Sequence, residues 1–329
     1  MDWKAVFKDK INNEFASKKV LVIGDLMVDE YIMGNVKRIS PEAPVPVLDY
    51  RERRLEAGGA CNVAHNLRSL GAQVLVAGVS DEDEAGRWLR SHFSDLDIDI
   101  SCILSEAGRP TTLKTRYAVK GHQLLRVDNE IVRNINETTQ KLICEYIEEK
   151  ADELDAVIIS DYKKGVLGEA SFTKRIIQIC NNNNILIAID SKSSDIAAFA
   201  NADFVKPNNL ELEAAVGITI EDEETLNQAG EKYLECSKAK ALVVTRGPKG
   251  ISVFEPNVRR VDYPAKDVQV FDVCGAGDTV ISTIAIGMCS GLSLGEAVKM
   301  ANLAAGVVIN KIGTVAISSE ELVRSIDEE

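Results

Sequence analysis

The 329-residue sequence has no apolar run approaching the ~20 residues that a membrane-spanning helix needs. Its first twenty residues carry too much charge for a secretion signal. Basic residues are in deficit, since 38 lysines and arginines against 51 acidic residues leave a net charge of −13, whereas a nucleic-acid-binding surface is normally basic. These absences predict a cytoplasmic protein that binds neither membranes nor nucleic acids. A local basic cluster could still hold a small anion.

Several catalytic signatures are also missing. The seven cysteines form no CxxC pair, so we expect neither a disulfide scaffold nor a zinc site. The sequence has no GxxxxGK[ST] phosphate loop and no HExxH, and the missing GxGxxG after the first expected strand argues against a nicotinamide-dependent dehydrogenase. The one GxSxG string, at residues 291–295, lies between two helical patterns and predicts a helix–helix turn.

What the sequence does contain is an alternation of two patterns. Short runs of Val, Ile and Leu without polar alternation suit strands buried on both faces of a parallel sheet. Helical patterns separate them, and this rhythm predicts one α/β domain with a doubly wound, mostly parallel sheet. The expected strands are residues 20–24, 157–161, 185–190, 204–208 and 242–247, and the expected helices are 59–70, 137–152, 169–180 and 221–236.

Two stretches break this rhythm. Residues 31–55 and 102–128 alternate polar and apolar side chains, as half-buried strands do, and Gly121-His122 is a plausible hairpin turn. We expect them to form a small β-sheet inserted in the α/β body. Such a sheet could be a lid over the site, a passive decoration or a surface that pairs two copies of the chain.

The richest motif is Asp272-Val273-Cys274-Gly275-Ala276-Gly277-Asp278, directly before an apolar helical run. Bare backbone N–H groups of Gly275, Ala276 and Gly277 at a helix N-terminus suit an anion. Asp278 beside that anion could accept a proton from an attacking hydroxyl. A tight structural turn before a buried helix would explain the same residues.

Three further positions suit a sugar substrate. Asp25 follows the first expected strand, where ligands of open α/β sheets bind, and its carboxylate could accept hydrogen bonds from sugar hydroxyls. Gly58 and Gly59 would let a ligand lie against the backbone, and Asn62 offers both a donor and an acceptor. The structural alternatives are a capping aspartate and a flexible turn before a helix.

Lys114 and Arg116 lie two residues apart in an alternating segment and therefore share one face of the expected strand. They could clamp a phosphate carried by the substrate. A solvated strand face is the alternative.

Two segments suit a nucleotide. Asn208 and Glu211, three residues apart after an expected strand, could face one ligand and hold magnesium-bound water, although a helix N-cap with an acidic first turn gives the same pattern. Thr245, Gly247 and Gly250 separate two β-like runs and could line a nucleotide or form a plain hairpin.

The order of these motifs resembles that of the ribokinase-like (PfkB) carbohydrate kinases over essentially the whole chain. The motifs are GD after the first strand, GGAxN, NxxE, TxGxxG and GAGD. The resemblance implies that Asp278 is the catalytic base and that the backbone of Gly275, Ala276 and Gly277 forms an anion hole. It implies ATP as phosphoryl donor, magnesium organised by Glu211, and a monovalent cation such as potassium beside Asp272. The nucleotide site would then consist of Asn208, Asn209, Leu210, Glu211, Thr245, Gly247, Gly250 and Asn302.

A narrower resemblance lies in residues 38–47, RISPEAPVPV, which are similar to a segment of D-glycero-β-D-manno-heptose 7-phosphate kinases. Residues 160–165 and 190–192 also resemble that subfamily, although Ser191 replaces an expected Pro and Cys274 replaces the commoner Thr. Lys192 is then expected at the cofactor site or near the substrate phosphate. Bifunctional relatives carry a nucleotidyltransferase domain after the kinase, an activity expected here from another protein.

The sequence therefore predicts a kinase that phosphorylates O1 of a heptose 7-phosphate in ADP-heptose biosynthesis, and a homodimer formed through the inserted sheet. Two alternatives stay open. One is another PfkB sugar or nucleoside kinase of the ribokinase or fructokinase type. The other is a non-catalytic, regulatory sugar-phosphate-binding protein.

Overall fold

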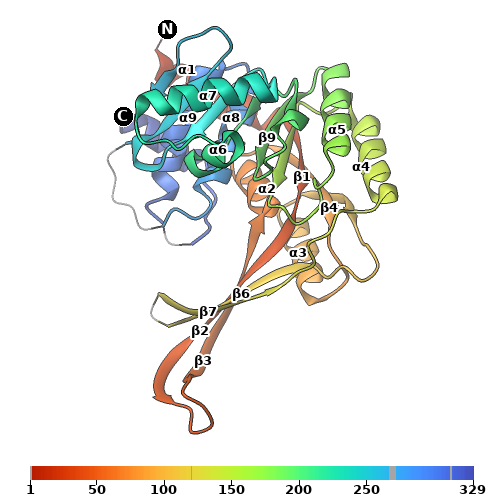
Figure 1. The fold of residues 1–329 in the computed structure, drawn as a ribbon, viewed down its shortest axis with the longest axis vertical. Coiled ribbons are helices and arrows are strands. Elements are labelled where there is room, and N and C mark those ends of the chain that lie inside the picture. Colours follow the sequence, from red (N-terminus) through yellow and green to blue (C-terminus); the bar gives the residue numbers. More distant parts are fainter. Residues whose placement is uncertain (1, 120, 267–271, 312) are drawn as a thin grey trace.

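A computed structural model describes residues 2–119, 121–266, 272–311 and 313–329 of the chain. The chain forms a layered α/β body from which a long, narrow sheet projects (Figure 1). Within the described residues, no helix is both long enough and apolar enough to cross a membrane.

Among the described residues, the body is built on a nine-stranded sheet in which seven neighbouring strands are parallel and two strands at one edge are antiparallel. In spatial order the strands are β13 (Val261–Tyr263), β12 (Ile251–Phe254), β11 (Leu242–Thr245), β10 (Phe204–Val205), β9 (Leu186–Ser191), β8 (Ala156–Asp161), β1 (Lys19–Gly24), β4 (Gln73–Val79) and β5 (Asp99–Leu104).

Helices cover both faces of this sheet, which confirms the predicted doubly wound arrangement. One face packs against α1 (Trp3–Asp9), α2 (Ala60–Ser69), α3 (Glu84–Asp95), α8 (Ala276–Cys289), α9 (Leu294–Val308) and α10 (Ser319–Asp327). The other packs against α4 (Glu137–Lys150), α5 (Ala170–Asn182), α6 (Asn209–Val216) and α7 (Glu223–Ser237). Short helical turns are η1 (Lys10–Glu14), η2 (Phe15–Ser17), η3 (Ile196–Phe199) and η4 (Gly247–Lys249).

Strand β1 shows why its residues form a central strand. Val20 and Val22 enter the core on one face, and Leu21 and Ile23 enter the core on the other. All four are fully buried, so no position along this segment accepts a polar side chain. The 291–295 string lies between α8 and α9, as the sequence predicts.

The projecting sheet contains four strands in the order β3 (Pro46–Gly59), β2 (Leu26–Ile39), β6 (Thr112–Val119) and β7 (His122–Asn129) within the described part of the chain. We call it the lid sheet. Its strands begin earlier and end later than the predicted 31–55, because Leu26, Met27 and Val28 are as buried and apolar as a body strand. Residues 102–104 belong instead to β5, where Cys102 pairs with Ala77 of β4.

The two sheets meet at a switch in strand order. Strand β1 pairs with β4 on one side and with β8 on the other, and ligands of open α/β sheets bind beyond the carboxyl ends of strands at such a point. Asp25 follows β1 and leads directly into β2, while Tyr162 follows β8. The lid sheet therefore grows out of the predicted site.

Candidate active site

The glycine-rich turn before α8 has the backbone that its residues require. Gly275 is the N-cap of the helix and has φ of 78°, a left-handed conformation that favours glycine. A Cβ at this position would also lie only 2.8 Å from the Asn62 side-chain nitrogen. Ala276 and Gly277 follow in the first helical turn. The Ala276 N–H donates to the Val273 carbonyl oxygen at 3.3 Å, whereas the Gly277 N–H at the helix start has no partner among the described residues.

Asp278 is buried in that first turn and is held by two donors. The Asn62 side-chain amide donates to Oδ2 at 2.7 Å, and the Tyr162 hydroxyl donates to Oδ1 at 2.8 Å. Burial and the charge of Asp190 raise the pKa of Asp278 to about 6, against the opposing effects of Asn62, Tyr162 and Lys206. Such a carboxylate can accept a proton near neutral pH.

A buried cation lies beside this carboxylate. Lys206 forms an ion pair of 2.9 Å with Asp190, and its Nζ lies 3.3 Å from where a Cβ on Gly277 would be. Burial lowers the pKa of Lys206, but Asp190, Glu211 and Asp278 together raise it above its usual value, so the ammonium stays charged. A positive charge therefore reaches the start of α8.

Asp25 fastens the loop that carries Tyr162. Its Oδ2 accepts the backbone N–H of Tyr162 at 2.8 Å and of Lys164 at 3.0 Å, and its Oδ1 accepts that of Val166 at 3.1 Å. Burial raises the pKa of Asp25, and these amides oppose the rise. The structure thus shows a loop-organising role for Asp25, while its predicted contact with sugar hydroxyls stays a prediction.

The GGAxN segment brings α2 against α8. Gly59 has φ of 57°, and Cβ atoms on Gly58 and Gly59 would lie 2.5 Å from Oδ2 of Asp29 and 2.7 Å from the Asp25 carbonyl oxygen. These two glycines therefore allow β3 to approach β2 closely before α2 begins. The turn delivers Asn62 to Asp278.

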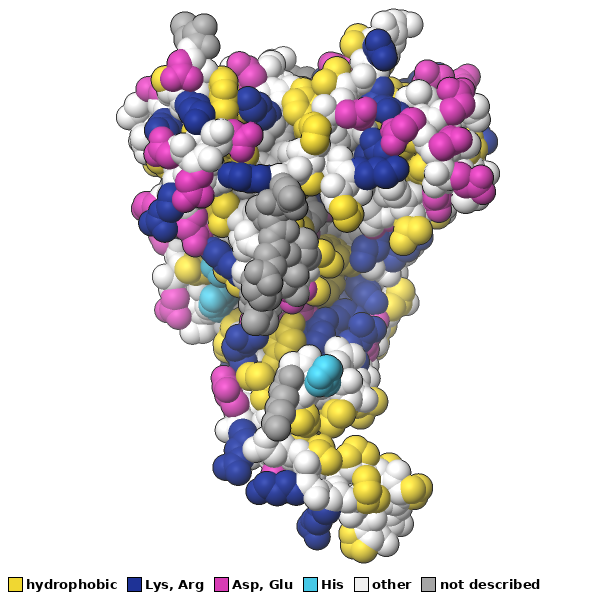
Figure 2. Space-filling model, turned by 90° about the vertical axis from the view of Figure 1, so that its left-hand side faces the viewer, with side chains coloured by type: hydrophobic (Ala, Val, Ile, Leu, Met, Phe, Trp, Pro, Cys, Tyr) yellow, Lys and Arg dark blue, Asp and Glu magenta, His cyan; other side chains and the backbone are white. Residues whose placement is uncertain are grey.

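Lys114 and Arg116 lie on the lid sheet in ion pairs. The Lys114 ammonium is 3.0 Å from both Asp128 and Glu130, and Arg116 is 2.6 Å from Asp29. Figure 2 shows lysine and arginine side chains where the lid sheet meets the body. These cations are neutralised by the chain itself, so an anion would have to compete with carboxylates for them.

Asn208 and Glu211 form a capping box at the start of α6, because each side chain accepts the other residue's backbone N–H. The predicted capping alternative is therefore present, and the magnesium role of Glu211 stays a prediction. Asn208 also forms an isolated parallel bridge with Thr245, which precedes the β11–β12 hairpin. Asn209 has a buried Oδ1 without a hydrogen-bond partner among the described residues, whereas Leu210 is 74% exposed.

The other predicted nucleotide residues lie around these segments. Gly247 and Gly250 have φ of 56° and 87°, so the loop between β11 and β12 needs both glycines. Asn302 on α9 donates to the Pro264 carbonyl oxygen at 2.6 Å. The Lys192 ammonium lies 4.4 Å from the centre of the Tyr162 ring, which connects it to Asp278 through the Tyr162 hydroxyl.

Asp272 organises backbone near the glycine-rich turn. Its Oδ1 accepts the Cys274 N–H at 2.9 Å, and its Oδ2 accepts the Gly313 N–H at 3.1 Å. Burial raises the pKa of Asp272, but hydrogen-bond donors of Val273, Cys274 and Gly313 together lower it below its usual value, so it stays ionised. An ionised carboxylate between two loops fits a monovalent cation without showing that one binds.

No group of three or more His, Cys, Asp or Glu side chains in the described residues is arranged to hold a metal ion. Magnesium usually keeps several waters and is held through one or two carboxylates plus substrate phosphates. Glu211 and Asp190 are carboxylates near Lys206 that could serve in that way.

Sequence reasoning missed three residues of this site: Tyr162, Asp190 and Lys206. Tyr162 and Lys206 directly follow parallel strands, and Asp190 is the penultimate residue of β9. Their shared position at the carboxyl edge of the sheet was the available signal.

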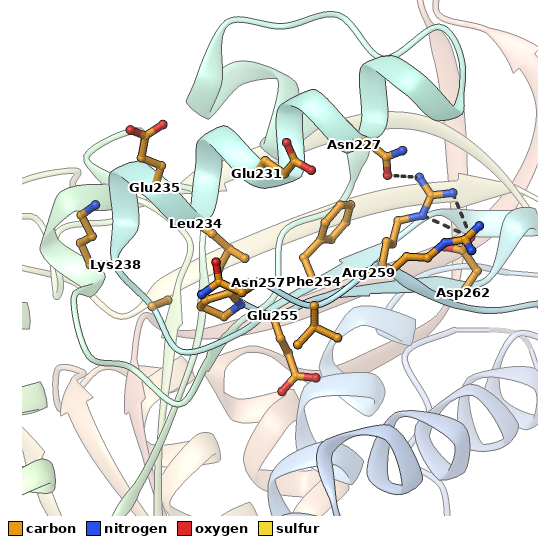
Figure 3. A pocket seen from close by; sticks show the side chains of 14 residues that line it. Asn227, Glu231, Leu234, Glu235, Lys238, Phe254, Glu255, Asn257, Arg259 and Asp262 are labelled. Atoms are coloured by element: carbon orange, nitrogen blue, oxygen red, sulfur yellow. Dashed lines mark hydrogen bonds and ion pairs between the residues drawn. The ribbon is translucent and has the colours of Figure 1, made fainter.

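A separate pocket lies away from this site, between α7 and the edge strands β12 and β13 (Figure 3). Phe254 and Leu234 line its floor, and Glu231, Glu235 and Lys238 line one side. It shares no residue with the predicted site.

The fold and the site define a carbohydrate kinase. A model of the pfkB family of carbohydrate kinases matches residues 17–321, and the chain belongs to this family. Two curated relatives are named bifunctional protein HldE. One, from Syntrophotalea carbinolica, is 41% identical over 92% of this chain, and the other, from Helicobacter hepaticus, is 39% identical over 95%. The chain spans only 62% and 64% of their lengths.

Solved structures support the fold. Arabidopsis thaliana ribokinase complexed with ribose and ATP superposes with a TM-score of 0.76 at 17% identity, covering 94% of this chain and 98% of that one. Phosphofructokinase-2 from Escherichia coli in complex with potassium gives 0.76 at 20% identity, with the same coverage. At such identities the likeness concerns the fold alone.

Proposed function

We propose that this kinase transfers the γ-phosphoryl group of ATP to O1 of D-glycero-β-D-manno-heptose 7-phosphate, a step toward ADP-heptose. The observation that carries the kinase chemistry is the position of Asp278. It is a buried carboxylate with a pKa of about 6, and it lies in the first turn of α8, where the backbone N–H groups of Gly275 and Gly277 have no hydrogen-bond partner among the described residues.

Asp278 is the proposed general base. When the sugar hydroxyl attacks the γ-phosphorus, its proton passes to a carboxylate oxygen, and the bond from the γ-phosphorus to the leaving ADP oxygen breaks. Asn62 and Tyr162 fix the orientation of the carboxylate, so little reorganisation is needed at the moment of transfer.

The amides of Gly275, Ala276 and Gly277 are the proposed anion hole for the transferring group. The helix start favours negative charge, and the buried Lys206 ammonium adds a second positive element beside Gly277. Magnesium, when bound, would neutralise charge on the phosphates, and Glu211 is proposed to hold one of its waters. A potassium ion near Asp272 would support the same turn.

The nucleotide would lie along the edge formed by the starts of α6 and of the β11–β12 loop. The Asn208–Thr245 bridge brings these two segments together, and the buried Oδ1 of Asn209 at this edge has no hydrogen-bond partner among the described residues. Gly247 and Gly250 would allow close approach of the base or ribose. Lys192 is the proposed contact to the phosphates.

The heptose substrate is supported by the resemblance of residues 38–47 and by the relatives named bifunctional protein HldE. Those relatives are longer than this chain, as kinases joined to a second catalytic domain would be. Lys114 and Arg116 on the lid sheet are proposed to bind the substrate phosphate, and closure of the lid would exclude water as a competing acceptor.

A panel of acceptors tests the substrate. ADP release should be fastest with heptose 7-phosphate and slow with ribose, fructose and fructose 6-phosphate. Preference for ribose or fructose would instead identify a kinase of those types, and no release with any acceptor would favour a regulatory sugar-phosphate-binding protein. The cytoplasmic location remains a prediction from the sequence.

We also propose a homodimer formed through the lid sheet. Apolar side chains are unusually exposed on its strands and tip, and Figure 2 shows them on the lower part of the molecule. They include Ile39, Val45, Tyr50, Leu124, Leu125 and Val127, with exposures from 46% to 63%.

A further inference from the structure

Tyr162 makes three contacts near the proposed base, through its hydroxyl, its backbone N–H and its ring. Its hydroxyl donates to Oδ1 of Asp278, while its backbone N–H donates to Asp25. The third contact is the Lys192 ammonium over the ring face. A tyrosine therefore connects a strand-end carboxylate, the proposed phosphate-binding lysine and the proposed base.

The loop that carries Tyr162 has little freedom to move. Lys163 has φ of 57°, an uncommon conformation for a residue with a side chain, and its N–H donates to Asp161. Gly165 has φ of 106°, and a Cβ there would lie 1.8 Å from the Arg133 carbonyl oxygen. With three further amides bound to Asp25, the loop holds the Tyr162 hydroxyl at a fixed place.

We propose that Tyr162 is the positioning residue for the Asp278 base, which it orients and keeps ionised through the hydroxyl hydrogen bond. This inference rests on the proposed function, since it assigns a role only if Asp278 is the base. Asn62 holds Oδ2 and Tyr162 holds Oδ1, so each oxygen keeps one direction free for the substrate hydroxyl.

The Tyr162 hydroxyl keeps its proton under working conditions and can therefore donate to Asp278. Burial and the charge of Asp278 raise the pKa of Tyr162 well above its usual value, so the phenol stays protonated. The charged groups that face Asp278 from the neighbouring elements are Asp190 from β9 and Lys206 after β10, and the charge of Glu211 on α6 acts on Lys206 and Tyr162. None of them donates a hydrogen bond to the carboxylate, so Tyr162 and Asn62 share that task alone among the described residues.

The substitution Tyr162→Phe tests the role, because it keeps the ring and the contact with Lys192 and removes only the donor. Loss of a hydrogen bond to an ionised carboxylate raises its pKa. We expect the acid limb of the kcat/KM profile to move upward by about 0.5–1 pH unit. At pH 6 kcat/KM should therefore fall about two- to fivefold, with the deficit narrowing above pH 8 and the KM for ATP nearly unchanged.

Tyr146→Phe is the matched control, since the Tyr146 hydroxyl lies 3.4 Å from Asp99 and makes no contact with Asp278. Its pH profile should overlay that of the wild-type enzyme. A Tyr162→Phe profile that overlays the wild type would overturn the inference, provided that circular dichroism shows a folded protein. Asp278→Asn distinguishes failure of this inference from failure of the proposed function. If Asp278→Asn is inactive while the pH profile of Tyr162→Phe is unshifted, only the positioning role of Tyr162 is wrong. If Asp278→Asn is active, the assignment of Asp278 as the base is wrong.

Discussion

The side-chain amide of Asn62 donates a 2.7 Å hydrogen bond to Oδ2 of Asp278, across 216 positions of the chain. Asn66 extends the contact, because its side-chain nitrogen donates to the Asn62 carbonyl oxygen at 2.9 Å and its Oδ1 accepts from the Thr279 hydroxyl at 2.8 Å. Helices α2 and α8 are thus joined by a buried polar network. The helix that follows GGAxN and the helix that follows GAGD are therefore held together at the proposed base.

Gly275→Ala should disrupt that network. The new Cβ would lie 2.8 Å from the Asn62 nitrogen and displace it from Asp278, so kcat should fall by about tenfold or more. Left-handed backbone at a residue with a Cβ also costs about 1–2 kcal/mol of stability. Steady-state kinetics and thermal unfolding measure both effects.

Gly217→Ala separates the two causes. Gly217 has φ of 69° at the end of α6, with no atom within 4 Å of the Cβ position. It should lose a similar amount of stability and keep wild-type kinetics. Equal activity losses in the two variants would assign the effect to backbone strain instead of Asn62.

The kcat/KM profile of the wild-type enzyme should show an acid limb with an apparent pKa near 6. Asp278 titrates at about this value because burial and Asp190 disfavour its charged form. Below that pH the protonated carboxyl cannot accept the sugar proton, so the rate should fall about tenfold per pH unit, and above it the rate should level off. An acid limb near pH 4 would mean that the base is an ordinary exposed carboxylate.

Arg116→Met should raise the KM for the sugar phosphate about tenfold and leave the KM for ATP unchanged, because Arg116 is proposed to bind the substrate phosphate. Arg126→Met is the control, since Arg126 is an exposed cation on β7 paired with Asp128. If Arg116 only neutralises Asp29, the double variant with Asp29→Asn should restore the KM, and the proposed phosphate contact would be wrong.

Leu125→Asp should convert the proposed dimer to a monomer, because a charge placed in an apolar interface loses its hydration. Leu125 is 56% exposed on the lid sheet, whereas the control position Leu142 is 44% exposed on α4 of the body. Light scattering with size-exclusion chromatography should report monomers for Leu125→Asp and dimers for the control variant Leu142→Asp. A wild-type monomer would contradict the proposed assembly.

The fold could be predicted largely because the strands of the body are recognisable from a local pattern of consecutive apolar residues. Residues 20–23 and 157–159 are apolar at every position and buried on both faces of the sheet, and both segments form strands. The prediction placed the start of the first lid strand too late, because the buried, apolar residues at the start of β2 have the composition of a strand in the body. Short edge strands such as β13 carry too few residues for a pattern.

The site could be predicted only in part. Gly275 and Asp278 were visible because a helix start and a left-handed turn need particular residues nearby in sequence. The contact of Tyr162 with Asp278 joins residues 116 positions apart, and the ion pair of Lys206 with Asp190 depends on two neighbouring strands. Such contacts depend on the order of strands in the sheet, which cannot be predicted from the spacing of residues within one segment.

The most direct test of the account is the turnover of Asp278→Asn with ATP and heptose 7-phosphate, measured by ADP release beside the wild-type enzyme. Replacing a buried carboxylate whose pKa is raised removes an unfavourable charge, so the variant should remain folded. We predict that kcat falls by about 10² or more while ATP binding, followed by calorimetry, is nearly intact. Turnover close to that of the wild type would contradict the assignment of Asp278 as the base.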